Sequence, residues 1–406
     1  MASVVVNGDT SGAVTLSAPA VAGTVTVTLP STNGTMAVLP TATGVLTEAA
    51  GGTGTTTGYY GFKNRIINGA MVIDQRNAGA AITPTAAVYT LDRWEYAPTV
   101  ASKLTIQQNA GSLSAANRPA GFINYLGITS TSSYSLLSGD YFTIRQNIEG
   151  LNAADLGWGT ANASTVTLSF WARSSLTGTH SGSIYNIDGT RSYVFSFTVV
   201  SANTWEYKTI TIAGDTTGTW VTTNAVGIRV GFSLGTGPTY SGTAGSWNGT
   251  LLLAATGSVN VVGTNGATFY ITGVQLEKGS TATSFDYRPY GTELQLVQRY
   301  YYQYTGNASA QTPIASAFLA STVSAQGLLQ FPVPMRAAPT QTSSSAADIE
   351  VTWSAGTSAT SALTLDLAST LNASLRITTT GLTTGQGGYF RIGIGATKYL
   401  AFSAEL

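Results

Sequence analysis

The chain has 406 residues with 18 basic and 18 acidic side chains, so its formal net charge is zero. Charged residues make up 9% of the chain, against about 25% in an ordinary globular protein. The chain therefore has no excess of basic residues, which nucleic-acid binding proteins use to contact phosphates. Because cysteine is absent, disulfides, thiolate nucleophiles and thiolate metal sites are excluded. The one histidine, His180, excludes centres built from several histidines, while 43% hydrophobic residues favour a folded core over disorder.

Residues 1–60 are rich in Val, Thr, Gly and Ala and are almost uncharged. Residues 24–29 alternate polar and apolar side chains, which predicts a strand, and the Gly/Thr run at 51–58 predicts a flexible linker. The first residues carry neither a basic region nor a long apolar run, so no signal peptide is expected. With so few large side chains to bury, residues 1–60 are expected to be an extended attachment segment that wraps a partner or sister chains.

Residues 61–290 contain six of the seven tryptophans and the clearest strand patterns. Apolar and polar side chains alternate over residues 166–173, 193–199 and 226–234, and residues 269–276 predict a fourth strand. Short strands separated by turn residues are typical of a β-sandwich or jelly roll. We therefore predict an all-β protein with a central jelly roll.

Residues 291–304 predict a short linking helix. Thr292 and Gln295 fit the N-cap and N3 positions of a capping box. Apolar side chains follow at helical spacing at Leu294, Val297, Tyr301 and Tyr304. Because residues 305–406 return to strand patterns, we expect this helix to pack between the jelly roll and a C-terminal β-sandwich; the alternative is a helix at a three-fold axis.

Aromatic and basic side chains on polar strand faces are the first candidate ligand-binding residues. Trp171 lies on the polar face of its strand, two residues before Arg173, and Arg229 has an equivalent place on another strand. An indole offers a flat apolar surface and arginine offers hydrogen-bond donors, which together suit a sugar ring. Alternatively, a second sheet or a sister chain covers this face. Further aromatic candidates lie in glycine-rich loops, where they either bind a ligand or anchor the loop: Trp158, Tyr240 and Trp247.

Catalytic chemistry has weaker support, and we predict neither catalytic residues nor a cofactor. Residues 231–235 match the Gly-x-Ser-x-Gly nucleophile elbow, but the residues after them begin no helix and only His180 is available as a base. A glycosidase needs two carboxylates about 5–9 Å apart, and sequence cannot pair the acids that we considered, Asp92, Glu277, Asp286 and Glu293. Oxygen-rich loops in residues 61–290 leave a structural calcium open, with its ligands unknown.

Four stretches resemble parts of bacteriophage tail-fibre and receptor-binding proteins. Residues 63–77, which continue to Asp92-Arg93-Trp94, resemble the opening of a recurrent fibre domain. Residues 168–173, 203–208 and 214–220 are similar to jelly-roll carbohydrate-binding-like modules. Residues 274–301 look like the close of that module, and residues 331–340 resemble the domain that follows.

The resemblance implies a β-rich homotrimer whose N-terminal part docks on the phage particle and whose distal domains face the host. We therefore expect a non-enzymatic virion protein of a tailed phage, assembled in the host cytoplasm and released by lysis. Residues 1–60 would dock on tail, baseplate or capsid proteins, and the jelly roll would contact a host surface polysaccharide. No long coiled coil or β-helical shaft is visible, so a capsid fibre or decoration protein is the alternative. A polysaccharide depolymerase is the second alternative, and we expect no membrane insertion.

Overall fold

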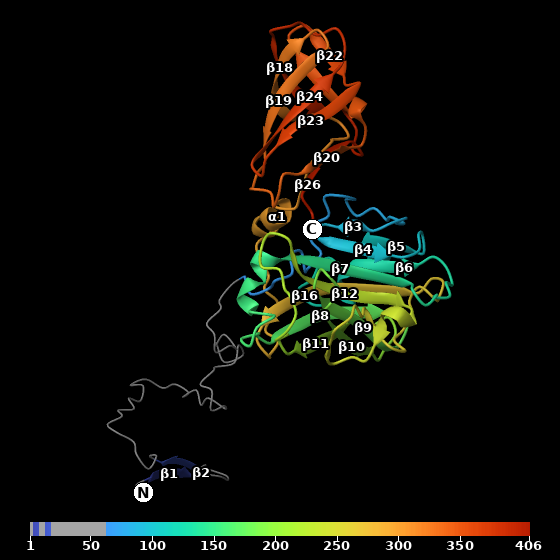
Figure 1. Ribbon diagram of the computed structural model, residues 1–406, viewed down its shortest axis with the longest axis vertical. Coiled ribbons are helices and arrows are strands. Elements are labelled where there is room, and N and C mark those ends of the chain that lie inside the picture. Colours follow the sequence, from blue (N-terminus) through green and yellow to red (C-terminus); the bar gives the residue numbers. More distant parts are fainter. Residues whose placement is uncertain (1–2, 8–12, 18–61) are drawn as a thin grey trace. The chain divides into compact units, whose positions relative to one another are not determined.

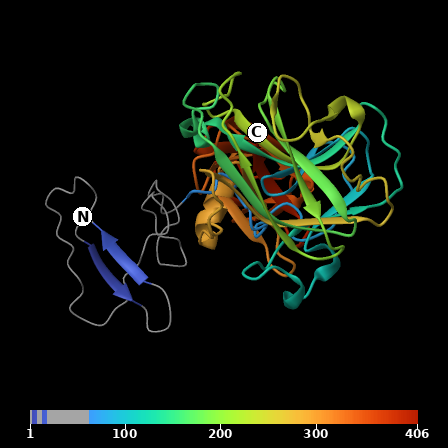
Figure 2. The same cartoon turned by 90° about the horizontal axis from the view of Figure 1, so that it is seen from below.

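The computed structural model describes residues 3–7, 13–17 and 62–406, and the chain divides into two units, 1–58 and 59–406. In the first unit, β1 (Ser3–Asn7) and β2 (Ala13–Ser17) pair antiparallel and are drawn in dark blue in Figure 1 and Figure 2. The expected strand at 24–29, the linker at 51–58 and the other parts of the attachment segment lie outside the described residues.

The second unit is all-β, as predicted, and begins with a sandwich of two antiparallel sheets (Figure 1). One sheet has seven strands in the order β14-β10-β9-β12-β7-β4-β3, and the other has five in the order β11-β8-β16-β6-β5. The seven-stranded sheet consists of β3 (Val88–Leu91), β4 (Trp94–Pro98), β7 (Tyr141–Glu149), β9 (Gly178–Tyr185), β10 (Ser192–Val199), β12 (Val226–Thr236) and β14 (Trp247–Asn248). The five-stranded sheet consists of β5 (Leu104–Gln108), β6 (Leu126–Ser130), β8 (Val166–Ser174), β11 (Glu206–Ile212) and β16 (Thr268–Lys278).

Short elements complete the sandwich and the region after it. A two-stranded parallel pair lies in the loop region after β12, formed by β13 (Ser241–Gly242) and β15 (Ala254–Ala255). Single turns of 3-10 helix occur at η2 (Ala110–Ser112), η3 (Ala115–Asn117), η4 (Gly150–Asn152), η5 (Ala154–Leu156), η6 (Pro238–Tyr240) and η7 (Ala346–Asp348).

The core of the sandwich lies between its two sheets, because one face of each central strand is apolar. Phe170 of β8 and Phe232 of β12 are fully buried and meet edge to face, with ring centroids 5.0 Å apart. Successive side chains of a strand point to opposite faces of the sheet. The residues that alternate with Phe170 therefore lie on the outer face of the five-stranded sheet, where Trp171 and Arg173 are half-buried.

Residues after 300 form two further sheets with a separate core that includes Leu375 and Phe390. The smaller sheet has the order β17-β26-β20 and the larger has the order β22-β21-β25-β18-β19-β24-β23. The smaller sheet consists of β17 (Tyr301–Thr305), β20 (Thr340–Ser343) and β26 (Tyr399–Ser403). The larger consists of β18 (Thr312–Ser321), β19 (Ser324–Gln330), β21 (Ile349–Trp353), β22 (Gly356–Ala359), β23 (Ala362–Ala368), β24 (Asn372–Thr378) and β25 (Gly387–Ile392).

The linking helix α1 (Tyr290–Gln298) is shorter than predicted, and its predicted N-cap is wrong. Pro289 holds the N-cap position without a capping side chain, so Thr292 lies inside the helix. The helix ends before Tyr301 and Tyr304, because both belong to β17 and pair with β26. Helical spacing in the sequence is thus overridden by strand pairing with residues about a hundred positions away.

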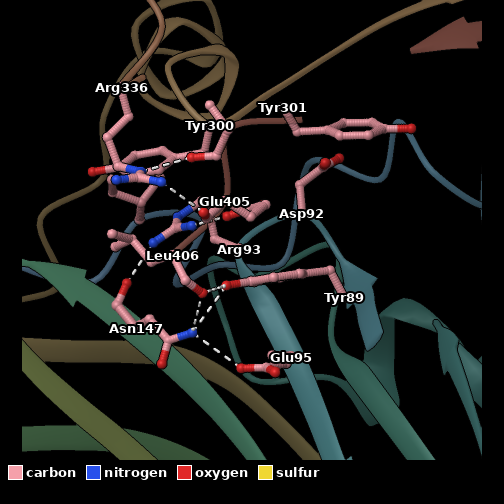
Figure 3. Close-up of polar contacts among 12 residues, drawn as sticks. Tyr89, Asp92, Arg93, Glu95, Asn147, Tyr300, Tyr301, Arg336, Glu405 and Leu406 are labelled. Carbon is pink, nitrogen blue, oxygen red and sulfur yellow. Dashed lines mark hydrogen bonds and ion pairs between the residues drawn. The ribbon is translucent and has the colours of Figure 1, made fainter. Parts of the chain in front are cut away.

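A polar network joins the residues after β26 to the sandwich (Figure 3). Arg76 Nη2 donates to Glu405 Oε1 (2.7 Å), and Arg93 donates to the other carboxylate oxygen. Tyr89 Oη and Asn147 Nδ2 both donate to the Leu406 carbonyl oxygen, at 2.9 and 3.1 Å. The C-terminal network, as used below, comprises Arg76, Tyr89, Asp92, Arg93, Asn147, Glu405 and Leu406.

Arg93 forms the turn between β3 and β4 and is the most deeply buried cation of the network, with 1% of its side chain exposed. Its φ of 70° is a left-handed conformation that side-chain-bearing residues seldom adopt. The guanidinium lies 3.7 Å from the centre of the Tyr300 ring and also donates to the carbonyl of Asn147. These contacts hold the unfavourable turn in place.

Burial raises the pKa of Asp92 to about 7, although the charge of Arg76 and the Gln75 amide act in the opposite direction. The folded pKa thus lies above the unfolded value of about 3.9. The stabilisation by Asp92 is therefore complete below about pH 4 and is lost as the pH rises through about 7. The quantity to compare is the melting temperature of Asp92→Asn minus that of wild type. We expect this difference to be more positive at pH 8 than at pH 4.5, because asparagine stays neutral while Asp92 ionises. Circular dichroism melts at both pH values check this, and an unchanged difference would contradict it.

Candidate functional site

The outer face of the five-stranded sheet carries the candidate site, and Trp171 lies at its centre. Trp171 of β8 is directly opposite Tyr207 of β11, and their ring centroids are 5.4 Å apart at 49°. Tyr207 is 45% exposed, whereas Trp171 is half-buried. Two adjacent rings therefore form a partly open apolar surface on a rigid sheet.

A β-bulge in β16 brings a second aromatic group beside Trp171. The bulge includes Gly273, whose φ is +62° and at which a Cβ atom would lie 2.7 Å from the Phe122 ring and 3.2 Å from Trp171. Only glycine combines this backbone with such close approach. Phe122 in turn contacts Phe285 edge to face at 5.1 Å and Tyr287 at 6.2 Å.

Five rings thus gather on this side of the sheet, and Tyr287 is 53% exposed. The aromatic face, as used below, comprises Phe122, Trp171, Tyr207, Phe285 and Tyr287. Of these five residues, the sequence pattern indicated Trp171 alone. The alternation in residues 206–212 is the signal that would have placed Tyr207 on an outer face, whereas Phe285 and Tyr287 lie in an irregular segment without periodicity.

Arg173 lies beside the aromatic face, as its position two residues after Trp171 predicts. Its Nε donates to the Asn203 carbonyl (2.9 Å), and its guanidinium lies 5.2 Å from the centre of the Tyr270 ring. Tyr270 is its direct neighbour on β16. One side of the arginine is therefore anchored, while its two terminal nitrogens form no hydrogen bond with the described chain.

Arg229 lies on the other sheet, so the structure does not bring it together with Trp171. In β12 its Nε donates to Asn147 Oδ1 (2.9 Å), and its guanidinium lies 5.9 Å from the Tyr185 ring centre. Burial lowers the pKa of Arg229, and the charge of Arg145 acts in the same direction. Alternation predicted an outward position for Arg229, but it could not show to which sheet the strand belongs.

Trp158 and Trp247 pack with Trp220, and of these three rings Trp158 is buried whereas Trp220 and Trp247 are half-buried. The three rings are mutually edge to face, with centroids 4.8, 5.3 and 5.5 Å apart. Trp158 is 7% exposed and donates its Nε1 hydrogen to Ser164 O (2.8 Å), and Trp247 donates to Ala213 O (2.8 Å). Tyr240 packs edge to face on Tyr141 at 5.3 Å. These contacts anchor the loops, while Trp247 and Tyr240 remain half-buried.

The acids considered as a glycosidase pair all have structural partners. Arg288 pairs with Glu293 at 3.1 Å and lies 3.7 Å from Asp286. Glu277 accepts hydrogen bonds from Thr283 and Gln275, and Asp92 belongs to the C-terminal network. Within residues 62–406, these carboxylates therefore fix loops and turns of the scaffold.

Ser233 of the Gly-x-Ser-x-Gly pattern and His180, the one available base, each contact other groups and not one another. Ser233 lies within β12, not in a strand-to-helix turn, and its hydroxyl is 2.8 Å from that of Thr236. His180 lies 3.1 Å from Leu176 O and is stacked against Phe197 and Phe269.

In the described part of the chain, no three His, Cys, Asp or Glu side chains gather closely enough to hold a metal ion. No described helix is long and apolar enough to cross a membrane.

Comparison with known proteins gives structural likenesses only. No family model matches the chain, and no curated protein matches its sequence. The enzymatically active domain of tailspike protein 4 of bacteriophage CBA120 is similar with a TM-score of 0.30 and 12% identity, over 53% of this chain and 22% of that one. A family 11 carbohydrate-binding module from Clostridium thermocellum, in complex with a β-1,3-1,4-mixed-linked tetrasaccharide, has a TM-score of 0.24 and 13% identity over 48% and 97% of the chains. A family 4 carbohydrate-binding module has a TM-score of 0.25 and 16% identity over 52% and 98%. Likeness at this level carries no argument about function, so the fold assignment depends on the sheets described above.

Proposed function

We propose that this protein is a structural adhesin of a tailed bacteriophage virion, which holds a host surface polysaccharide on the aromatic face. The observation that carries the binding part is the Trp171–Tyr207 pair, which is partly open on the outer face of a rigid sheet. A sugar ring has an apolar C–H face that stacks on aromatic rings and a polar rim that needs hydrogen-bond partners. Arg173 supplies donors at the edge of this surface.

The virion part of the proposal is supported by the composition and by the four stretches that resemble phage fibre proteins. In this proposal three copies of the chain assemble, residues 1–60 dock on tail, baseplate or capsid proteins, and the particle is assembled in the host cytoplasm and released by lysis. The role is non-enzymatic, which agrees with the scaffold partners of Glu277, Asp286 and Glu293.

A capsid fibre or decoration protein is the competing virion role. Gold-labelled antibody against residues 61–290, applied to intact particles, distinguishes the two by electron microscopy. Label on the tail or baseplate supports the receptor-binding role, whereas label over the head supports capsid decoration. A well-behaved antibody that leaves every particle unlabelled would overturn the virion assignment.

Replacing Trp171 with alanine is expected to weaken binding to host polysaccharide by roughly 30-fold, because central tryptophans of a binding surface contribute about 2 kcal/mol or more. Tyr207→Ala should act in the same direction. Adsorption of the purified protein to host cells, measured by fluorescence, checks both. Tyr389→Ala is the control, because this tyrosine is 40% exposed on a sheet of the C-terminal region. If Trp171→Ala adheres as strongly as Tyr389→Ala while both remain folded, Trp171 has a packing role only.

A further inference from the structure

Two arginines, Arg173 beside Trp171 on β8 and Arg118 in the segment before Phe122, lack a carboxylate partner in the described chain. Many other basic side chains form ion pairs, such as Arg145 with Glu95 and Arg191 with Asp215. Arg173 bonds a backbone carbonyl through Nε, and Arg118 donates to the Ile123 carbonyl through Nη1. Arg229 and Arg336 also have no carboxylate partner within residues 62–406, but Arg336 donates through all three guanidinium nitrogens to backbone carbonyls and Arg229 lies on the other sheet.

Arg118 and Arg173 are linked through a continuous set of packed rings. Trp205 Nε1 donates to the carbonyl of Asn117, the residue before Arg118 (2.9 Å). The Trp205 ring lies 5.7 Å from Tyr125, which lies 5.2 Å from Tyr270, the ring beneath Arg173. Both guanidinium groups therefore lie around one aromatic cluster at the edge of the outer sheet face.

The charges of both arginines act on Tyr125, the central ring of this cluster. Burial raises the pKa of Tyr125, and the charges of Arg118 and Arg173 act against that rise, as two nearby cations do. The acid on the neighbouring strand, Glu206, does not offset them, because it pairs with Lys208 and accepts hydrogen bonds from the amides of Val200 and Ser201. Glu206 is opposite Ala172, whose side chain belongs to the core.

We propose that the glycan held on the aromatic face is acidic, and that Arg173, with Arg118 at the same cluster of packed rings, binds its carboxylate or phosphate substituent. This inference rests on the proposed function. Trp171 and Arg173 lie on the same face of β8, roughly 7 Å apart along the strand. A sugar stacked on Trp171 can therefore extend a ring substituent or the next residue to the guanidinium. The planar fork of arginine matches both carboxylate and phosphate oxygens.

The experiment uses the full-length protein and an array of bacterial surface polysaccharides in three forms. The first form is native, the second has its carboxylates chemically reduced to alcohols, and the third has its phosphates removed. Wild-type protein is expected to bind native acidic glycans and to lose roughly tenfold to hundredfold in affinity when the relevant group is removed. The form that loses binding identifies carboxylate or phosphate as the group recognised. Binding should also weaken as salt is raised.

Arg173→Gln is expected to bind native acidic glycans as weakly as wild type binds the neutralised ones, and Arg118→Gln should show a smaller loss. Arg376→Gln is the matched control, because it removes the same charge from an exposed pair on β24. Equal binding of native and neutralised glycans, or an Arg173→Gln variant that binds like Arg376→Gln, would overturn this inference while leaving the proposed adhesin intact. Failure of the wild type to bind any glycan on the array would overturn both.

Discussion

Replacing Glu405 with alanine is expected to lower the free energy of unfolding of the 59–406 unit by roughly 3–5 kcal/mol. The reason is that Arg93, with 1% of its side chain exposed, would keep its charge in the interior without a carboxylate partner. The turn at Arg93, whose φ is unfavourable, would lose one of the contacts that hold it. Urea denaturation followed by tryptophan fluorescence measures the change.

Asp366→Ala is the control for this experiment. Asp366 forms the same kind of pair with Arg376, but Arg376 is 46% exposed, so the expected loss is about 0–1 kcal/mol. The double variant Glu405→Ala with Arg93→Met should recover part of the stability, because an apolar side chain removes the unpaired buried charge. Equal losses for Glu405→Ala and Asp366→Ala would show that the C-terminal network contributes no more than a surface ion pair.

Replacing Trp158 with alanine is expected to cost roughly 3–5 kcal/mol of stability, the usual range for a buried tryptophan. The cavity would open between Trp220 and Trp247, whose rings both pack on Trp158. Because Trp158 is 7% exposed, the folded fraction of this variant should retain its affinity for polysaccharide. Thermal melting and glycan binding, measured on the same preparation, test the two parts of the prediction.

Trp171→Ala serves as the reciprocal control, since it should lose binding with a smaller change in melting temperature. Trp158→Ala should therefore lose mainly stability, and Trp171→Ala should lose mainly binding. A Trp158→Ala protein that stays as stable as wild type but no longer binds polysaccharide would return the loop tryptophans to the binding site.

Alternation along single strands made the sandwich predictable from sequence. Residues 166–173, apart from Trp171, and residues 226–234 alternate, and the apolar residues in line with Phe170 and Phe232 are buried. The same pattern placed Trp171 and Arg173 on one outer face. It could not place Arg229, because both sheets of a sandwich produce the same alternation, and the choice between them depends on pairing with distant strands.

The aromatic face was only partly predictable, because most of it is assembled from segments without periodicity. Phe122 and Trp171 both approach Gly273 in the bulge of β16, Tyr287 packs on Phe122, and no local pattern signals these approaches. The Asp92-Arg93-Trp94 element forms the turn of the C-terminal network, so that motif belongs to the scaffold rather than to the ligand site.

The pairing of Arg93 with Glu405 spans 312 positions in the chain, and this separation has a consequence during synthesis. At about 5–20 residues per second, roughly 15–60 s pass between translation of the arginine and translation of its partner. For that interval Arg93 lacks the carboxylate of Glu405. The sandwich therefore reaches its final stability late, and contacts of such long range also slow folding. Nascent chains are accordingly most exposed to aggregation and proteolysis before residue 405 leaves the ribosome.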